Sequence, residues 1–135
     1  MKKVLKAILP CMLFACGSQF DTSLRILYVG EYSTSPITVN CQSFEGEYYE
    51  TLKDSLITDI ELKSEIIDNI GDLKRSEVDR ILNYSDVNVK IKLLASYSDG
   101  SSDTVCLGAF SNIFLNGIMM AEDSVFRQKI KTIIY

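Results

Sequence analysis

The sequence contains no histidine and no tryptophan, and only two of its 135 residues are proline. The absence of histidine excludes the chemistry that depends on an imidazole, namely Ser-His and Cys-His nucleophiles and histidine-ligated metals. The four cysteines form no Cys-x-x-Cys motif, the usual pattern of a zinc site or a dithiol redox centre. Glycine-rich phosphate loops and the Gly-x-Ser-x-Gly elbow are also absent.

The composition is that of a folded domain rather than a disordered chain. Hydrophobic residues make up 47% of the sequence and charged residues 24%. The length favours one globular unit. The acidic residues are scattered, and no pair stands out as a catalytic dyad. Asp99–Asp103 lacks the alternating acids and distal glutamate of a calcium loop, which favours a solvated turn. We therefore assign no catalytic residue, no metal ligand and no cofactor.

The N-terminus has the layout of a secretory signal peptide. Lys2, Lys3 and Lys6 precede an uninterrupted apolar run, Ala7–Ala15. As a helix this run would measure about 14 Å at roughly 1.5 Å per residue. The hydrocarbon core of a bilayer is about 30 Å thick, so the run is too short to span it.

The end of the apolar run resembles the lipobox of bacterial lipoproteins. Leu13–Gly17 reads Leu-Phe-Ala-Cys-Gly: an aliphatic residue, a variable one, a small one and then cysteine. The resemblance implies cleavage before Cys16, a diacylglycerol on its sulfur and an acylated new amino group, with palmitate as the expected fatty acid. Cys11 follows Leu9-Pro10 and fits the box badly. The alternative is an ordinary signal peptide that is cut elsewhere.

The short Cys-Gly-Ser start is similar to that of small envelope lipoproteins of the Bacteroidota. We therefore expect a signal peptide over residues 1–15, a lipidated cysteine with a short tether over 16–23, and a globular domain over 24–135. Processing leaves 11 basic residues against 18 acidic ones, a net charge of −7. Such a charge disfavours nucleic acid and anionic headgroups as partners. Attachment to the membrane is expected through lipid on Cys16.

Two cysteines remain in the expected mature chain, Cys41 and Cys106. In an oxidising compartment they can form a disulfide. The alternative is a pair of buried free thiols that pack as small apolar residues. Side-chain alternation does not decide between the two.

The apolar patterns predict an α+β domain: an antiparallel sheet of five or six strands with two or three helices packed on one face. Strands are expected over Leu24–Glu31, Ile37–Phe44, Leu56–Leu62, Val87–Tyr97, Thr104–Phe110, Ile113–Leu115 and Ile118–Met120. Helical spacing predicts two short pieces over residues 64–84, the second starting near Ser76, and a last helix capped by Asp123 or Ser124. Asn116-Gly117 is a type I′ turn signal.

Two further features of the sequence can each be interpreted in two ways. Tyr48 and Tyr49 lie in an acidic stretch and either form a binding surface or pack on the sheet. Three tripeptides resemble the O-glycosylation signal of exported Bacteroidota proteins, although the same residues cap helices and turns: Asp54-Ser55-Leu56, Asp103-Thr104-Val105 and Asp123-Ser124-Val125.

We expect a lipid-anchored, non-enzymatic envelope protein that binds a protein partner or serves as an accessory domain. The expected location is the outer membrane, with the domain facing the periplasm or the cell surface. Alternatives are a tethered inhibitor or immunity protein against a hydrolase or toxin, and a small carboxylate-based hydrolase.

Overall fold

The computed structural model of the protein describes residues 21–77 and 87–135. Within these residues the elements are, in chain order, β1 (Ser23–Tyr28), α1 (Phe44–Glu47), β2 (Lys53–Leu56), α2 (Ile60–Gly71), β3 (Val89–Ser96), β4 (Ser102–Gly108), β5 (Ile113–Leu115), β6 (Ile118–Met120) and α3 (Ser124–Ile134). Cys16, the expected signal peptide and the helical turns expected after Glu77 lie outside the described residues.

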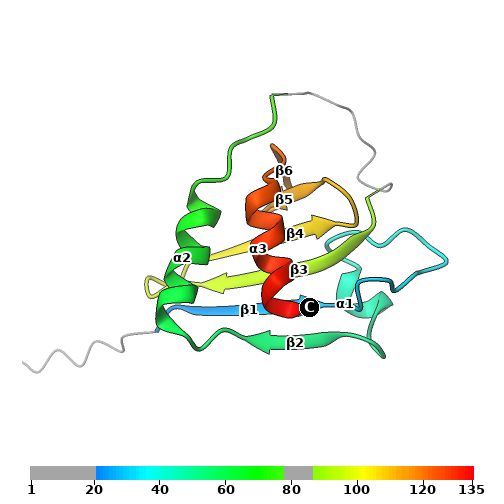
Figure 1. Ribbon diagram of the computed structural model, residues 1–135, viewed down its shortest axis with the longest axis horizontal. Helices are drawn as coiled ribbons and strands as arrows, with labels where there is room; N and C mark the ends of the chain where they lie inside the picture. Colours follow the sequence, from blue (N-terminus) through cyan, green and yellow to red (C-terminus); the bar gives the residue numbers. More distant parts are fainter. Residues whose placement is uncertain (1–20, 78–86) are drawn as a thin grey trace, which may run out of the picture.

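The strands form one antiparallel sheet in the order β2-β1-β3-β4-β5-β6. The two longer helices, α2 and α3, lie side by side over one face of it (Figure 1), where Lys129 Nζ of α3 reaches Asn69 Oδ1 of α2 at 3.0 Å. The sequence-based prediction of an α+β domain is confirmed: the sheet has six strands and the fold has three helices.

Both long helices begin at an aspartate whose side chain accepts a backbone hydrogen bond. Asp59 accepts from the N–H of Leu62 at 2.8 Å, and Asp123 accepts from the N–H of Phe126 at 2.9 Å. Their apolar faces then pack on the sheet. This helix-side core comprises Leu24, Ile26, Ile57, Ile66, Ile70, Leu73, Ile91, Leu93, Ala95, Val105, Leu107, Ile113, Phe126 and Ile130.

The opposite face of the sheet, called here the second face, is covered by the connection from β1 to β2. Residues 29–52 cross it and include the short helix α1. The core on this side comprises Leu27, Val29, Val39, Phe44, Tyr48, Val87, Val89, Cys106 and Phe114. The sheet is therefore buried on both faces, although regular helices of any length cover only one of them.

A β-bulge in β3 moves two valines to the second face. The pairing register with β4 shifts between Val89 and Ile91, so the strict alternation predicted over Val87–Tyr97 is interrupted. Ile91 and its successors on the same face pack under the helices, whereas Val87 and Val89 belong to the second-face core. A strand with unbroken alternation over Val87–Tyr97 would place all of them on one face, and the one extra residue of the bulge reverses the alternation.

The strand expected over Ile37–Phe44 is wrong. This segment pairs with no neighbour as a ladder and instead crosses the second face to α1. Ile37 is 52% exposed, whereas Val39 is fully buried. Val39 meets β3 through one backbone hydrogen bond, from Val89 N–H to its carbonyl at 2.7 Å. The apolar alternation of this segment arises because single residues such as Val39 contact the core from a loop that crosses the sheet.

The strand expected over Leu56–Leu62 is also wrong, because it joins the end of β2 to the start of α2. The N–H of Leu62 donates to the capping Asp59, so the helix begins at Ile60, four residues before the helical stretch predicted from residue 64. The first strand is confirmed in place but ends at Tyr28. The hairpin β5–β6 is confirmed with its turn, since Asn116 and Gly117 have φ values of 51° and 80°. The last helix is confirmed with Asp123 as its cap.

Candidate functional site

A disulfide joins the crossing loop to the centre of the sheet. Cys41 is bonded to Cys106, with a Cα–Cα separation of 5.9 Å, across 65 residues of sequence. Cys106 is fully buried on the second face of β4, whereas Cys41 is partly exposed. Of the two states left open by the sequence, the structure therefore has the bonded one. The bond fixes the loop at the turn over residues 41–43.

Side chains of the same turn hold its shape. The Asn40 Oδ1 accepts hydrogen bonds from the backbone N–H groups of Gln42 and Ser43, both at 2.9 Å. The Ser43 Oγ in return accepts from the N–H of Asn40 at 3.2 Å. Such reciprocal bonds between a side chain and the backbone stabilise a turn that has no strand partner.

A largely buried lysine of β3, Lys92, attaches the turn to the sheet. Lys92 Nζ donates to the carbonyl of Cys41 at 3.1 Å and to the Glu45 carboxylate at 2.7 and 3.0 Å. Its side chain is only 12% exposed, so the aliphatic stem packs on the sheet while the ammonium is satisfied at the loop. The disulfide, Asn40 and Lys92 together preorganise residues 40–43.

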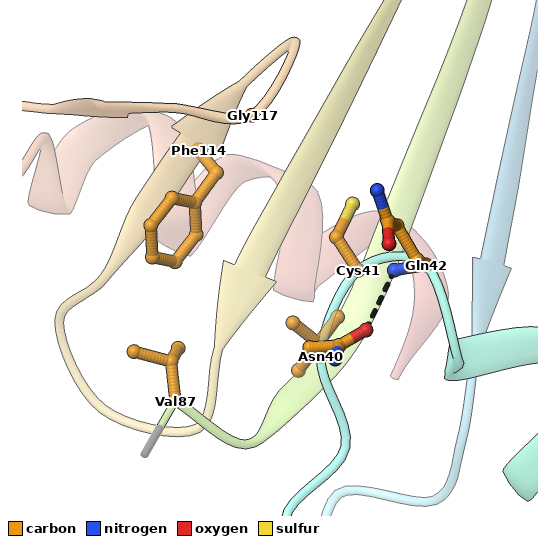
Figure 2. A pocket seen from close by; sticks show the side chains of 7 residues that line it. Asn40, Cys41, Gln42, Val87, Phe114 and Gly117 are labelled. Atoms are coloured by element: carbon orange, nitrogen blue, oxygen red, sulfur yellow. Dashed lines mark hydrogen bonds between the residues drawn. The ribbon is translucent and has the colours of Figure 1, made fainter. Parts of the chain in front are cut away.

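A pocket of about 350 Å³ lies between this turn and the end of the sheet. In Figure 2 the Phe114 ring and Val87 stand on one side, and the turn from Asn40 to Gln42 stands on the other. The pocket is lined by Asn40, Cys41, Gln42, Val87, Val89, Phe114 and Gly117.

The lining combines an apolar floor with an amide rim. Val87, Val89 and Phe114 are almost fully buried, whereas Asn40 and Gln42 are exposed. Among the described lining residues no side chain is ionisable while the disulfide is intact. A pocket with apolar walls and a few fixed amides is suited to hold a ligand or a partner side chain without covalent chemistry.

Aromatic side chains are exposed at the end of the sheet where β1 and β4 finish. Tyr32 is 91% exposed, Tyr49 79% and Phe110 87%. We call these three residues the aromatic end. Tyr48, in contrast, is buried against Phe44 with ring centroids 5.5 Å apart. Of the two neighbouring tyrosines, therefore, one packs on the sheet and the other is available for contact.

Three acidic residues of the described chain, Asp54, Asp99 and Asp103, have local hydrogen-bond partners. A hydrogen bond from Arg25 lowers the pKa of the Asp54 carboxyl, and bonds from the hydroxyl and N–H of Ser101 lower the pKa of Asp99. Asp103 accepts from Tyr97 Oη at 2.7 Å. Within residues 21–77 and 87–135 no group of three potential metal ligands is found.

The three Asp-Ser/Thr tripeptides lie in different surroundings. Asp54-Ser55-Leu56 is in the edge strand β2, Asp103-Thr104-Val105 is inside β4, and Asp123-Ser124-Val125 starts α3. Their aspartates form an ion pair, side-chain hydrogen bonds and a helix cap, respectively. Glycosylation of these positions stays a prediction. Among them, Ser124 is the hydroxyl residue that is exposed.

The sequence singles out Cys41, which lines the pocket, and its partner Cys106, but it does not predict the other lining residues. The apolar pattern predicts a strand that contains Asn40 and Gln42, and it places Phe114 in a strand of a hairpin. The one local signal was Asn40-x-x-Ser43, a spacing that is typical of a side-chain-stabilised turn.

No helix in the described part of the chain is both long enough and apolar enough to cross a bilayer. Comparisons of the chain with models of protein families, with curated proteins and with solved structures found no match.

Proposed function

We propose that the protein is a lipoprotein of the bacterial cell envelope whose domain binds a partner without catalysing a reaction. Lipid on Cys16 attaches it to a membrane, the outer membrane, with the domain on the periplasmic or external side. The lipobox-like Leu13–Gly17 supports the anchor. The disulfide between Cys41 and Cys106 supports an oxidising compartment.

The pocket beside the disulfide is the observation that carries the binding proposal. Its floor is apolar, its described lining is free of acids and bases, and its rim is fixed by a covalent bond. A rigid site of this kind favours affinity because little conformational entropy is lost on binding.

The chemistry of the partner is inferred from the pocket and, separately, from the exposed aromatic residues. The pocket volume suits an apolar side chain or a small ligand, and exposed tyrosines are typical anchors of protein interfaces. The acidic charge of the mature chain favours a partner with a basic surface. Tyr49 follows Glu47 and precedes Glu50, and this arrangement also suits a tethered inhibitor or immunity protein against a basic hydrolase or toxin.

The anchor is tested by labelling cells that express the full-length protein with radioactive palmitate. We expect label in the wild type and in the control Cys11→Ala, and no label in Cys16→Ala. The Cys16→Ala variant should also leave the membrane fraction. Label in Cys16→Ala would show that the anchor is assigned to the wrong residue.

The binding surface is tested with a photo-crosslinking amino acid in place of Gln42, on the pocket rim. Gln128 is the matched control, because it is also an exposed glutamine but lies on α3, over the other face of the sheet. We expect a discrete adduct in envelopes from Gln42 and none from Gln128. The same adducts from both positions, or none from Gln42, would argue against the pocket as the binding site.

A further inference from the structure

Two aliphatic side chains are exposed where the N-terminal segment enters the fold. Leu56, the last residue of β2, is 57% exposed, and Ile60, the first residue of α2, is 76% exposed. The three residues between them include buried Ile57 and the capping Asp59. We call Leu56 and Ile60 the anchor corner.

Two hydrogen bonds place the anchor corner next to the start of β1. The N–H of Ile57 donates to the carbonyl of Leu24 at 2.9 Å. Lys63, one turn after Ile60, donates from Nζ to the carbonyl of Thr22 at 2.8 Å. In Figure 1 the first turn of α2 stands directly beside the beginning of β1. The chain therefore enters the domain at this corner.

The distance to the expected lipid is short. Asp21 is five residues after Cys16, and five extended residues reach at most about 17 Å. A chain that short keeps the start of β1 close to the bilayer surface. The anchor corner is the part of the domain that a lipid on Cys16 holds nearest to the membrane.

We propose that Leu56 and Ile60 enter the headgroup region of the bilayer as a second membrane contact beside the lipid. This inference rests on the proposed lipid anchor at Cys16. Exposed aliphatic side chains gain free energy by leaving water for the acyl boundary. The aromatic end, at the opposite end of the strands, then faces away from the membrane toward a partner.

The charges around the anchor corner select the kind of lipid. Asp59 and Glu61 stand beside Ile60, and Asp54 forms an ion pair with Arg25. Lys63 is the cation of α2 nearest to this corner, and it is bound to the Thr22 carbonyl. An acidic surrounding is repelled by anionic headgroups. The occupant is therefore a zwitterionic phospholipid surface.

The absence of tryptophan allows a direct test. Ile60→Trp places one fluorophore at the anchor corner, and Phe110→Trp places one at the aromatic end, where the native side chain is also highly exposed. Mature lipidated protein is purified and reconstituted into vesicles of zwitterionic phosphatidylcholine that carries bromine on its acyl chains. We expect Ile60→Trp to show a blue-shifted emission and loss of intensity, and Phe110→Trp to show neither.

Three outcomes separate this inference from the anchor itself. Lipidated Ile60→Trp that is not quenched would overturn the membrane contact and leave the lipid anchor standing. Equal quenching of both variants would also overturn it. A mature protein without lipid would overturn both. Leu56→Trp is the second probe if Ile60→Trp misfolds, and phosphatidylglycerol in the vesicles should reduce the quenching of either.

Discussion

Arg127 is the most deeply buried charge in the described part of the chain. Its guanidinium donates to the carbonyls of Gly108 at 2.7 Å and Asn112 at 3.0 Å, and it pairs with Glu122 at 2.9 Å. The residue is 8% exposed. It therefore satisfies the backbone of the β4–β5 connection and holds that connection against α3.

Replacing this arginine should cost much more than replacing an exposed ion-pair partner on the same helix. We expect Arg127→Ala to lower the free energy of unfolding by about 3 kcal/mol, because two carbonyls and a carboxylate lose their donor. Lys131→Ala, which removes an exposed pair with Glu31 at 3.3 Å, should cost about 0.5 kcal/mol. Urea unfolding of both variants measures this difference, and equal costs would contradict the role given to Arg127.

Single residues were predictable where their signal is local. Asp123 caps α3, and Asn116-Gly117 forms the expected turn, because both depend on a few neighbouring residues. Arg127 was not predictable as a buried residue. It follows Phe126 on an amphipathic helix, and its partners are carbonyls of a connection that periodicity does not place.

At the scale of elements, the β5–β6 hairpin depends on its turn. Gly117 has a φ of 80°, a conformation that side chains rarely adopt. We expect Gly117→Ala to destabilise the protein by about 1 kcal/mol. Gly71→Ala is the control, because Gly71 is the last residue of α2 with open space around it, and it should stabilise by about 0.5 kcal/mol. Thermal unfolding that shifts in the same direction for both would argue against this account.

The hairpins and the last helix were predictable from sequence because adjacent residues form them. The crossing loop over residues 29–43 was not, because its inward contacts are to strands far along the chain. Val39 meets Val89, and Cys41 meets Cys106. Asn40 and Gln42 of that loop line the pocket, so the sequence alone does not predict their place in it. The bulge before Ile91 likewise has no local signal.

At the scale of the whole molecule, the disulfide between Cys41 and Cys106 stabilises the second-face core. We expect the double variant Cys41→Ala/Cys106→Ala to lose about 4 kcal/mol of stability, since a closed loop of this length restricts the unfolded chain. The control is wild type in reducing buffer, which should lose a similar amount. Denaturant unfolding under both conditions is the measurement. Wild type that is equally stable with and without reductant would contradict the role of the bond.

The strand order has a consequence for when the protein can assemble. β1 is flanked on one side by β2 and on the other by β3, which begins at Val89. Until that later stretch has been synthesised, the first strand has one neighbour and no finished hydrophobic layer beneath it. Non-local pairing of this kind delays collapse. A nascent chain in which β1 still lacks its second neighbour therefore completes its sheet only after most of the protein has been synthesised.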